Sequence, residues 1–334
     1  MPSFSCTVDT SVPRGLRLDR YVAECLGLLS RSQIKSRGLK AAVNGKEVKI
    51  SRPIKTGDRL ELSWAQAEPV NLIPEDISLE VIYEDRRVVV INKAQGMVVH
   101  PGAGNRRGTL ANALLYRRLC REGFFLPPED AFPIPHAGPP VCGAGEGAPP
   151  GLYPGGAGLR PGIVHRLDKD TSGVIIAAWD DEALAFLADQ FKNRRVKKNY
   201  LAFIPGTLKE REGRIETFIA RDRRDRKRFT VSAAGRIAVT RYRVLRSWSG
   251  HSLLLLRPKT GRTHQLRVHL RYLGHPVSGD PIYGRPDPLF SGSGLMLHAK
   301  SLSIILPGRD EAQTFRAPLP ERFRLFIKKL NRQA

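Results

Sequence analysis

The sequence lacks several features that mark common protein classes. Its 334 residues include only four cysteines, Cys6, Cys25, Cys120 and Cys142, and no two of them form a Cys-x-x-Cys pair. A disulfide framework or a structural zinc site is therefore not expected, and free thiols in a reducing cytoplasm are the default. The chain also has no long apolar run, and its N-terminus has no charged region followed by an apolar one. These absences predict a cytoplasmic protein that is not held in a membrane.

Acidic residues are scarce relative to basic ones. The chain has 32 Asp and Glu against 55 Lys and Arg, which gives a formal net charge of +23. A surplus of this size indicates a polyanionic partner, most often a nucleic acid. An anionic membrane surface is the rival partner, but no strongly amphipathic basic helix supports it.

Residues 14–66 have the pattern of a small separate module. Apolar spacing predicts a first helix near residues 16–26, and Ser30–Gln33 is typical of the capped start of a second helix that runs to about Leu39. Asn44-Gly45 predicts a tight hairpin, and the alternation of Arg59–Trp64 predicts a strand. This order resembles the S4 RNA-binding domain. The residues expected to form its RNA-binding face are Arg20, Arg31, Lys35, Arg37 and Lys40.

The rest of the chain predicts a linker at residues 67–78 and a larger domain at 79–334. The larger domain shows many strands, few helices and no regular alternation of the two, which indicates an α+β domain built on a mostly antiparallel mixed sheet. Nearly half of residues 121–160 are Gly or Pro, so we expect an insertion there without helices or central strands.

The segment from Pro161 to Gly173 concentrates ionisable residues between two apolar runs. It predicts a strand, a charged turn and a second strand that ends near Ala178. Asp168 lies close in sequence to two cations, Arg166 and Lys169, and such neighbours favour the ionised carboxylate. On this segment alone, a solvated charged turn is an equally good interpretation.

Several motifs resemble the RluA/RluD family of RNA pseudouridine synthases, and they occur in that family's order. "PGIVHRLDKDTSG" at 161–173 is similar to its catalytic motif, "KKNYLAFIPG" at 197–206 to its tyrosine-bearing strand, and "PKTGRTHQLRVHL" at 258–270 to its arginine-bearing segment. Further similar segments are "INKAQGMVVHPG" at 91–102, "GDPIYG" at 279–284, "LHAKSL" at 297–302 and "FRAPLP" at 315–320. The resemblance covers essentially the whole chain. Two departures are Ala94, where a proline is usual after the lysine, and the long insertion.

The resemblance implies isomerisation of uridine within RNA. The N1–C1′ bond breaks and C5 joins C1′, with no redox step and no hydrolysis, so no cofactor is implied. Asp168 is implied as the carboxylate beside the sugar, either as nucleophile at C1′ or as base at C2′. Arg262 is implied as the buried cation that keeps this carboxylate ionised, because an arginine fork can hold a carboxylate through two hydrogen bonds. Tyr200 is implied to contact the target uracil, although a strand tyrosine is by itself more often core.

Other residues of the motifs are candidates for RNA contact. Arg166 is expected to occupy the gap left by the extruded base, because flipping a base costs a few kcal/mol unless a side chain compensates. His165 and Lys169 are expected to contact the RNA backbone. His264 and His269 invite a metal interpretation, but a spacing of five residues does not place them on one helical face, so no metal site is expected.

The favoured hypothesis is a monomeric cytoplasmic enzyme that acts on structured RNA, above all on large-subunit ribosomal RNA of the 23S type. Transfer RNA is an alternative substrate. A non-catalytic RNA-binding or ribosome-assembly factor is an alternative function, which loss of Asp168, Tyr200 or Arg262 would have favoured. A glycosidase-like hydrolase would need a second carboxylate, for which Asp170 is the nearest candidate.

Overall fold

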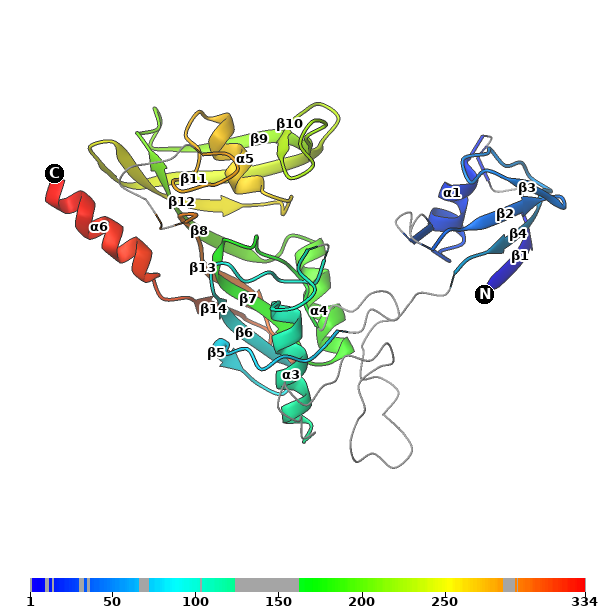
Figure 1. Ribbon diagram of the computed structural model, residues 1–334, viewed down its shortest axis with the longest axis horizontal. Helices are drawn as coiled ribbons and strands as arrows, with labels where there is room; N and C mark the ends of the chain where they lie inside the picture. The colour runs from blue at the N-terminus through cyan, green and yellow to red at the C-terminus, as the bar shows by residue number, and fades with distance from the viewer. Residues whose placement is uncertain are drawn as a thin grey trace. The chain divides into compact units, whose positions relative to one another are not determined.

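The computed structural model of the chain describes residues 2–9, 12–13, 15–29, 33–34, 37–65, 72–102, 104–123, 162–284, 292 and 294–333. The chain divides into two compact units, Met1–Val70 and Asn71–Ala334, and each has its own sheet and its own hydrophobic core (Figure 1). Most of the Gly/Pro-rich insertion expected at 121–160 lies outside the described residues.

The first unit is built on a four-stranded antiparallel sheet. The strand order is β1 (Ser3–Thr7), β4 (Arg59–Ser63), β2 (Lys40–Val43) and β3 (Lys46–Val48). The helix α1 (Leu18–Arg20) continues into a π-helical turn, η1 (Tyr21–Cys25). Asn44 and Gly45 connect β2 to β3 with φ of 53° and 76°, and this is the tight hairpin that the Asn-Gly pair predicts.

Parts of the expected N-terminal module differ in the structure. The strand β1 extends its sheet to Ser3, upstream of the expected start at residue 14. Lys40 begins a strand, so it does not belong to a basic helical face. Arg31 and Lys35, together with about half of the expected second helix, lie outside the described residues.

The second unit is built on a ten-stranded sheet. The strand order is β10-β9-β11-β12-β8-β13-β7-β6-β5, and β14 pairs with β13. The strands span Glu80–Glu84 (β5), Val88–Lys93 (β6), Ser172–Ala178 (β7), Lys197–Pro205 (β8), Glu212–Arg221 (β9), Phe229–Val231 (β10), Arg236–Trp248 (β11), His251–Pro258 (β12), Leu297–Ile305 (β13) and Ala312–Arg316 (β14). Every pairing is antiparallel except β7 with β13, which confirms the predicted α+β class with a mostly antiparallel sheet.

Four helices of this unit are α3 (Leu110–Arg121), α4 (Asp181–Lys192), α5 (Gln265–Tyr272) and α6 (Glu321–Gln333). The side chains of Thr109 and Asp180 cap α3 and α4, as oxygen side chains at these positions commonly do. The helix α5 contacts β9, β10 and β11, while α4 contacts β7. No helix among the described residues is long and apolar enough to cross a membrane.

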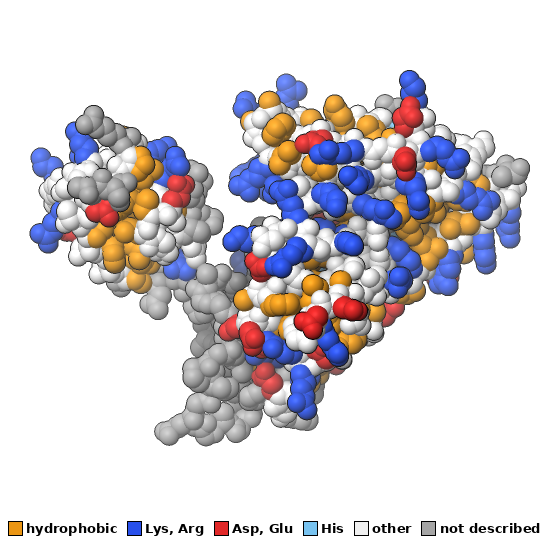
Figure 2. All heavy atoms as spheres, turned by 180° about the vertical axis from the view of Figure 1, so that it is seen from behind, with side chains coloured by type: hydrophobic (Ala, Val, Ile, Leu, Met, Phe, Trp, Pro, Cys, Tyr) orange, Lys and Arg blue, Asp and Glu red, His pale blue; other side chains and the backbone are white. Residues whose placement is uncertain are grey.

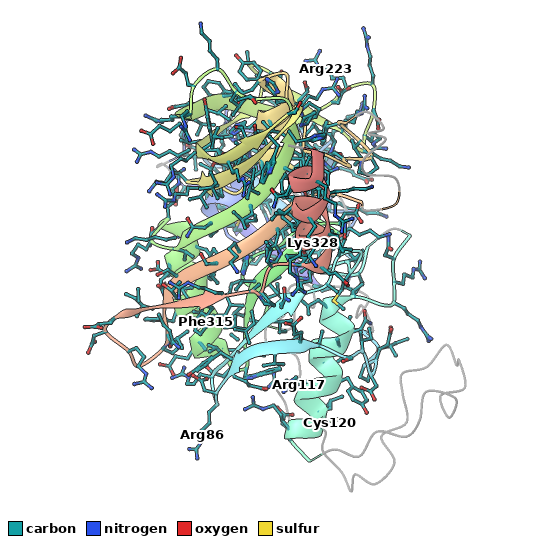
Figure 3. The ribbon with its side chains drawn as sticks, turned by 90° about the vertical axis from the view of Figure 1, so that its left-hand side faces the viewer. Arg86, Arg117, Cys120, Arg223, Phe315 and Lys328 are labelled. Carbon is teal, nitrogen blue, oxygen red and sulfur yellow. The ribbon has the colours of Figure 1, made fainter. Side chains whose placement is uncertain are left out.

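The helix α6 packs on the face of the sheet opposite α5. On β8, Phe203 lies at 4.8 Å, centroid to centroid, from Phe326 of α6. In register, Phe203 is opposite Leu253 of β12, so the two side chains lie on the same face of the sheet. Pro258 of β12 is opposite Thr240 and lies on the α5 side. Residues 253 and 258 have opposite parity along the strand and therefore face opposite sides. Figure 3 looks onto the side of the unit where α6 lies, with Lys328 labelled on that helix.

Two segments of the second unit, residues 72–78 and the segment around Ile163, differ from expectation. Residues 72–78, predicted to be linker, pack on the second unit: Leu72 is buried in its core, and the Asn112 side chain of α3 donates to the Ile73 carbonyl at 2.8 Å. The predicted strand before the charged turn is reduced to a single bridge between Ile163 and Ala177 of β7. The ionisable residues of the turn begin at His165, so the apolar run before it is too short to form a strand.

Gly173 allows β7 to approach β13. Its φ is +115°, which L side chains rarely adopt, and a Cβ built there would lie 2.2 Å from the carbonyl oxygen of Ala299. The parallel pairing of β7 with β13 passes through this residue, five positions after Asp168. The close approach therefore fixes where the charged turn leaves the sheet.

We expect Gly173→Ala to lower the free energy of unfolding by about 3 kcal/mol or more, because strain and a backbone clash act together. The matched control is Gly250→Ala, where φ is +79° but nothing lies within 4 Å of the new Cβ. We expect it to cost only about 1–2 kcal/mol. Urea unfolding of both variants provides the comparison, and equal costs would contradict the close approach.

Candidate active site

Asp168 lies in the turn before β7 and faces a pocket of ≈ 470 Å³. Its side chain is 17% exposed. The turn is closed by the Thr171 amide, which donates to the Asp168 carbonyl at 3.1 Å. Tyr200 of β8 and Arg267 of α5 line the same pocket. Three distant segments of the sequence therefore converge on this carboxylate.

Arg267 is the cation that contacts Asp168. Its Nη1 lies 3.3 Å from Oδ2 of Asp168, and its Nε and Nη2 each donate to an oxygen of Asp280 at 2.7 Å. The Arg267 and Asp280 side chains are 3% and 0% exposed. Asp280 therefore holds the guanidinium bidentately, and this leaves one edge of the guanidinium directed at Asp168.

The charges of this buried group support one another. Burial alone lowers the pKa of Arg267, but hydrogen bonds and charges from Asp280, with a further contribution from Asp168, raise it above its usual value. Burial raises the pKa of Asp280, yet its bonds to Arg267 outweigh that effect and lower it. The pair is consequently ionised at neutral pH, and its guanidinium stabilises a negative charge on Asp168.

The prediction that Arg262 forms an ion pair with Asp168 is wrong, because Arg267 is the arginine that contacts the Asp168 carboxylate. Arg262 lies in the turn before α5, where its Nε donates to the Ile237 carbonyl at 3.1 Å. It lines the same pocket without an ion pair to Asp168. The sequence around the two arginines differs. Arg267 stands between the apolar residues Leu266 and Val268 of α5, and a charged residue buried at such a position needs a partner of opposite charge.

Tyr200 lies at the wall of the pocket that Asp168 also lines. It is opposite Leu256 on one side and Ala299 on the other. Burial, with the negative charge of Asp168, raises the pKa of the Tyr200 phenol well above its usual value. The phenol is therefore neutral at physiological pH and available as a hydrogen-bond donor.

The three other motif residues occupy different environments. His165 accepts a hydrogen bond from the Ile176 amide at 3.1 Å and stacks on Phe191 at 4.6 Å between centroids. Burial, assisted by the charge of Lys198, lowers the pKa of His165 to about 3, so the ring is neutral. Arg166 is exposed and lines the pocket, whereas Lys169 is exposed and does not line it. His165 thus holds the turn against β7, whereas the Arg166 side chain is free to extend into the pocket.

Lys93 is a site residue that the sequence reasoning did not single out. It is 1% exposed, and its Nζ donates to the carbonyls of Ala94 and Met97 at 2.8 Å and of Lys169 at 3.0 Å. One ammonium therefore joins the loop after β6 to the residue that follows Asp168. Burial lowers the pKa of Lys93 to about 8, although the nearby aspartates 168 and 170 oppose this shift.

The pocket is strongly basic. Among its described lining residues Asp168 is the only acid. The lining cations are Arg166, Lys192, Arg194, Lys198, Lys259, Arg262 and Arg267. A single, largely buried carboxylate surrounded by cations fits a polyanionic substrate that presents one reacting group to that carboxylate. Figure 2 shows further lysine and arginine side chains spread over the second unit.

His264 and His269 have hydrogen-bonding roles. His269 lies between the hydroxyls of Thr217 and Thr240, at 3.1 and 2.9 Å. The Tyr283 hydroxyl, which accepts from the Phe229 amide, lies 2.9 Å from Nδ1 of His264. Both histidines thus tie α5 and its preceding turn to neighbouring segments.

Residues 152–272 match the family described as RNA pseudouridylate synthase. A ribosomal large subunit pseudouridine synthase D of Borreliella burgdorferi is 40% identical over 319 residues, which cover 93% of this chain and 89% of the relative. The chain belongs to the RNA pseudouridine synthase family. An uncharacterized RNA pseudouridine synthase, YlyB of Bacillus subtilis, is 35% identical over 95% of this chain and 94% of the relative.

Solved structures of pseudouridine synthases share the fold. The human RNA pseudouridylate synthase domain containing 4 has a TM-score of 0.54 and 25% identity, and covers 75% of this chain and 93% of its own. The human domain containing 1 has a TM-score of 0.50 and 27% identity, over 76% and 86%. The chain is thus an enzyme of the isomerase class by family and by fold, and the family match includes Asp168, Tyr200, Arg262 and Arg267.

We expect Lys93→Met to lower activity at pH 7, because three carbonyls lose their donor and the turn carrying Asp168 loosens. The pH dependence isolates the cause. A folded pKa near 8, below the ordinary 10.5, means that the cost of burying the charged form is present below pH 8 and is relieved as pH rises toward 10.5.

The wild-type free energy of unfolding, measured relative to Lys93→Met, should therefore rise by about 1 kcal/mol per pH unit above pH 8. Groups common to both proteins cancel in this difference. A difference that stays flat from pH 7.5 to 10 would show that Lys93 keeps an ordinary pKa.

We expect Arg267→Met to abolish turnover and to destabilise the fold by about 3–5 kcal/mol, because it leaves buried carboxylates unpaired. Arg262→Gln should leave the free energy of unfolding within about 0.5 kcal/mol of wild type, since its partner is one carbonyl at the surface. Chemical unfolding and steady-state kinetics on the same preparations test this contrast. A more severe loss in Arg262→Gln would restore Arg262 as the partner of Asp168.

Proposed function

We propose that this chain converts specific uridines of structured RNA to pseudouridine, and that the preferred substrate is large-subunit ribosomal RNA. The observation that carries the proposal is the single carboxylate of a basic pocket, Asp168, held by the buried Arg267. The ribosomal substrate is supported by relatives named ribosomal large subunit pseudouridine synthase D, from Borreliella burgdorferi, Xylella fastidiosa and Zymomonas mobilis at 34–40% identity.

In this proposal Asp168 carries the chemical step without a cofactor. The N1–C1′ bond breaks and a C5–C1′ bond forms; N1 gains a proton and C5 loses one, so atoms and electrons balance without an oxidant or water. Asp168 acts either as nucleophile at C1′ or as base at C2′, and both roles need it ionised. The guanidinium of Arg267 lies 3.3 Å away and supports that state.

The other pocket residues bind and position the nucleotide. Tyr200 presents a neutral phenol beside Asp168, suited to contact the uracil. Arg166 lies on the same turn and would fill the gap in the stack after the base is extruded. The lysines and arginines of the pocket wall, with Lys169 outside it, would bind the flanking phosphates.

The first unit would add affinity as an S4-like RNA-binding module. Lys40 is exposed on β2, and Arg37 is half-buried next to it. Arg20 forms an ion pair with Glu24 at 2.9 Å, so it would contribute to RNA binding only by exchanging that partner. We expect the protein to act as a monomer and in the cytoplasm.

The alternatives are less well supported. A hydrolase would need a second carboxylate in the pocket, but Asp170 is not among the described lining residues. A non-catalytic RNA-binding factor would not need a buried ion pair at Asp168. Transfer RNA stays a possible substrate class for the same chemistry, and mapping pseudouridines with and without the protein distinguishes it from ribosomal RNA.

We expect Asp168→Asn to abolish pseudouridine formation while RNA affinity changes less than about threefold, because phosphate contacts dominate binding. The matched control is Asp170→Asn, two residues away and outside the pocket lining. Release of tritium from C5-labelled RNA measures turnover, and filter binding measures affinity. Turnover by Asp168→Asn at a substantial fraction of the wild-type rate would show that another group carries the reaction.

A further inference from the structure

Arginines occupy the face of the second unit's sheet that α5 does not cover. On β11, Thr240 points to α5, since its hydroxyl lies 2.9 Å from Nδ1 of His269. Side chains alternate along a strand, so Arg241 and Arg243 point to the opposite face. Both side chains are exposed.

Arg241 lies directly between two other arginines. In register it is opposite Arg214 of β9 on one side and Arg257 of β12 on the other. Residues directly opposite in antiparallel strands have Cβ atoms about 5 Å apart, and like charges there are destabilising. Three adjacent strands thus place arginines side by side at a cost to folding.

A β-bulge adds a further arginine to this face. The pairing of β11 with β12 shifts between Val244 and Arg246, so that Arg246 lies opposite Leu253. Without the extra residue, Arg246 would point to the α5 side; with it, Arg246 follows Arg241 and Arg243 along one face. Its guanidinium lies over the Trp248 ring, 4.7 Å from the centroid.

We name this set the arginine face: Arg214, Arg241, Arg243, Arg246 and Arg257. Its neighbouring acids are few. Glu216 pairs with Arg214, and Glu212 is opposite Arg243 in register. Among the described residues, no carboxylate oxygen lies within 4.0 Å of the Arg241 or Arg243 guanidinium. The face thus keeps a surplus of positive charge that the fold itself does not neutralise.

The active-site pocket cannot account for this surplus, because its walls include α5 and the turn before it, on the other side of the sheet. Exposed Phe218 and Ile237 share the arginine face and would suit a protein partner. The unpaired arginines favour RNA, because planar guanidinium groups bind phosphate through two hydrogen bonds.

We propose that the arginine face binds the phosphate backbone of a second segment of the RNA whose uridine enters the pocket. The inference rests on the proposed function, since it takes structured RNA as the substrate. It identifies that substrate as one large enough to reach both faces of the sheet. A minimal stem-loop would engage the pocket alone.

The test uses the full chain carrying Arg241→Gln and Arg243→Gln together. The matched control carries Arg86→Gln and Arg309→Gln, which remove the same charge at exposed positions outside the arginine face (Figure 3 labels Arg86). The probes are a transcript of the large-subunit ribosomal RNA and a minimal stem-loop that contains one target uridine, not yet converted.

For the long transcript, the slope of log affinity against log salt should fall by about 1–2 in the arginine-face variant, because each lost phosphate contact contributes roughly 0.7–0.9. The control should keep the wild-type slope. On the saturating stem-loop, both variants should match the wild-type kcat.

Equal slopes for the two variants would overturn the proposal. So would a fall in kcat on the stem-loop, which would connect these arginines to the pocket. Weakened binding to ribosomal particles, with unchanged binding to bare RNA, would assign the face to a protein partner. Failure of the wild type to modify either RNA would reject the proposed function itself, and the slopes would still decide whether the face binds RNA.

Discussion

The active site depends on one guanidinium shared by two carboxylates. Arg267 is held bidentately by Asp280, which is fully buried, and its remaining edge meets Asp168 at the pocket. Burial by itself would raise the pKa of Asp280, and the hydrogen bonds and charge of Arg267 outweigh that effect and lower it. The arrangement divides the work between the two acids. Asp280 fixes the guanidinium through two hydrogen bonds, and Asp168 contacts its remaining edge while facing the pocket.

The backbone around Asp168 is held from the other side by buried contacts of a different kind. Lys93 joins the carbonyls of two loops, and Gly173 lets β7 close on β13 just after the turn. Catalytic side chains in general must be held within about 0.5 Å of their productive geometry, and these contacts would give Asp168 such support in the proposed mechanism. The turn is therefore positioned by the sheet core, although its sequence is almost entirely polar.

The sequence predicted the fold class and the hairpin at Asn44-Gly45, because these depend on local periodicity and turn chemistry. It did not predict β9, in which buried Ile215, Thr217 and Ile219 alternate with exposed Glu216 and Phe218. At the site, Asp168 and Tyr200 line one pocket, and their roles in the reaction stay predictions. The partner of Asp168 was misassigned because two arginines lie five residues apart in one segment, and the bidentate bond of Arg267 to Asp280 that sets it apart appears only in the fold.

The scarcity of acids, apparent in the sequence as a net charge of +23, has two different consequences in the structure. In the pocket seven cations surround one carboxylate, Asp168, and their charge suits a polyanionic substrate. On the far side of the sheet, the β-bulge at Leu245 directs a third arginine of β11 to a face already carrying like charges. A fold under selection for stability alone would not gather cations there, because repulsion between them opposes folding. The positions of these arginines are therefore better explained by the proposed binding of RNA than by a contribution to stability.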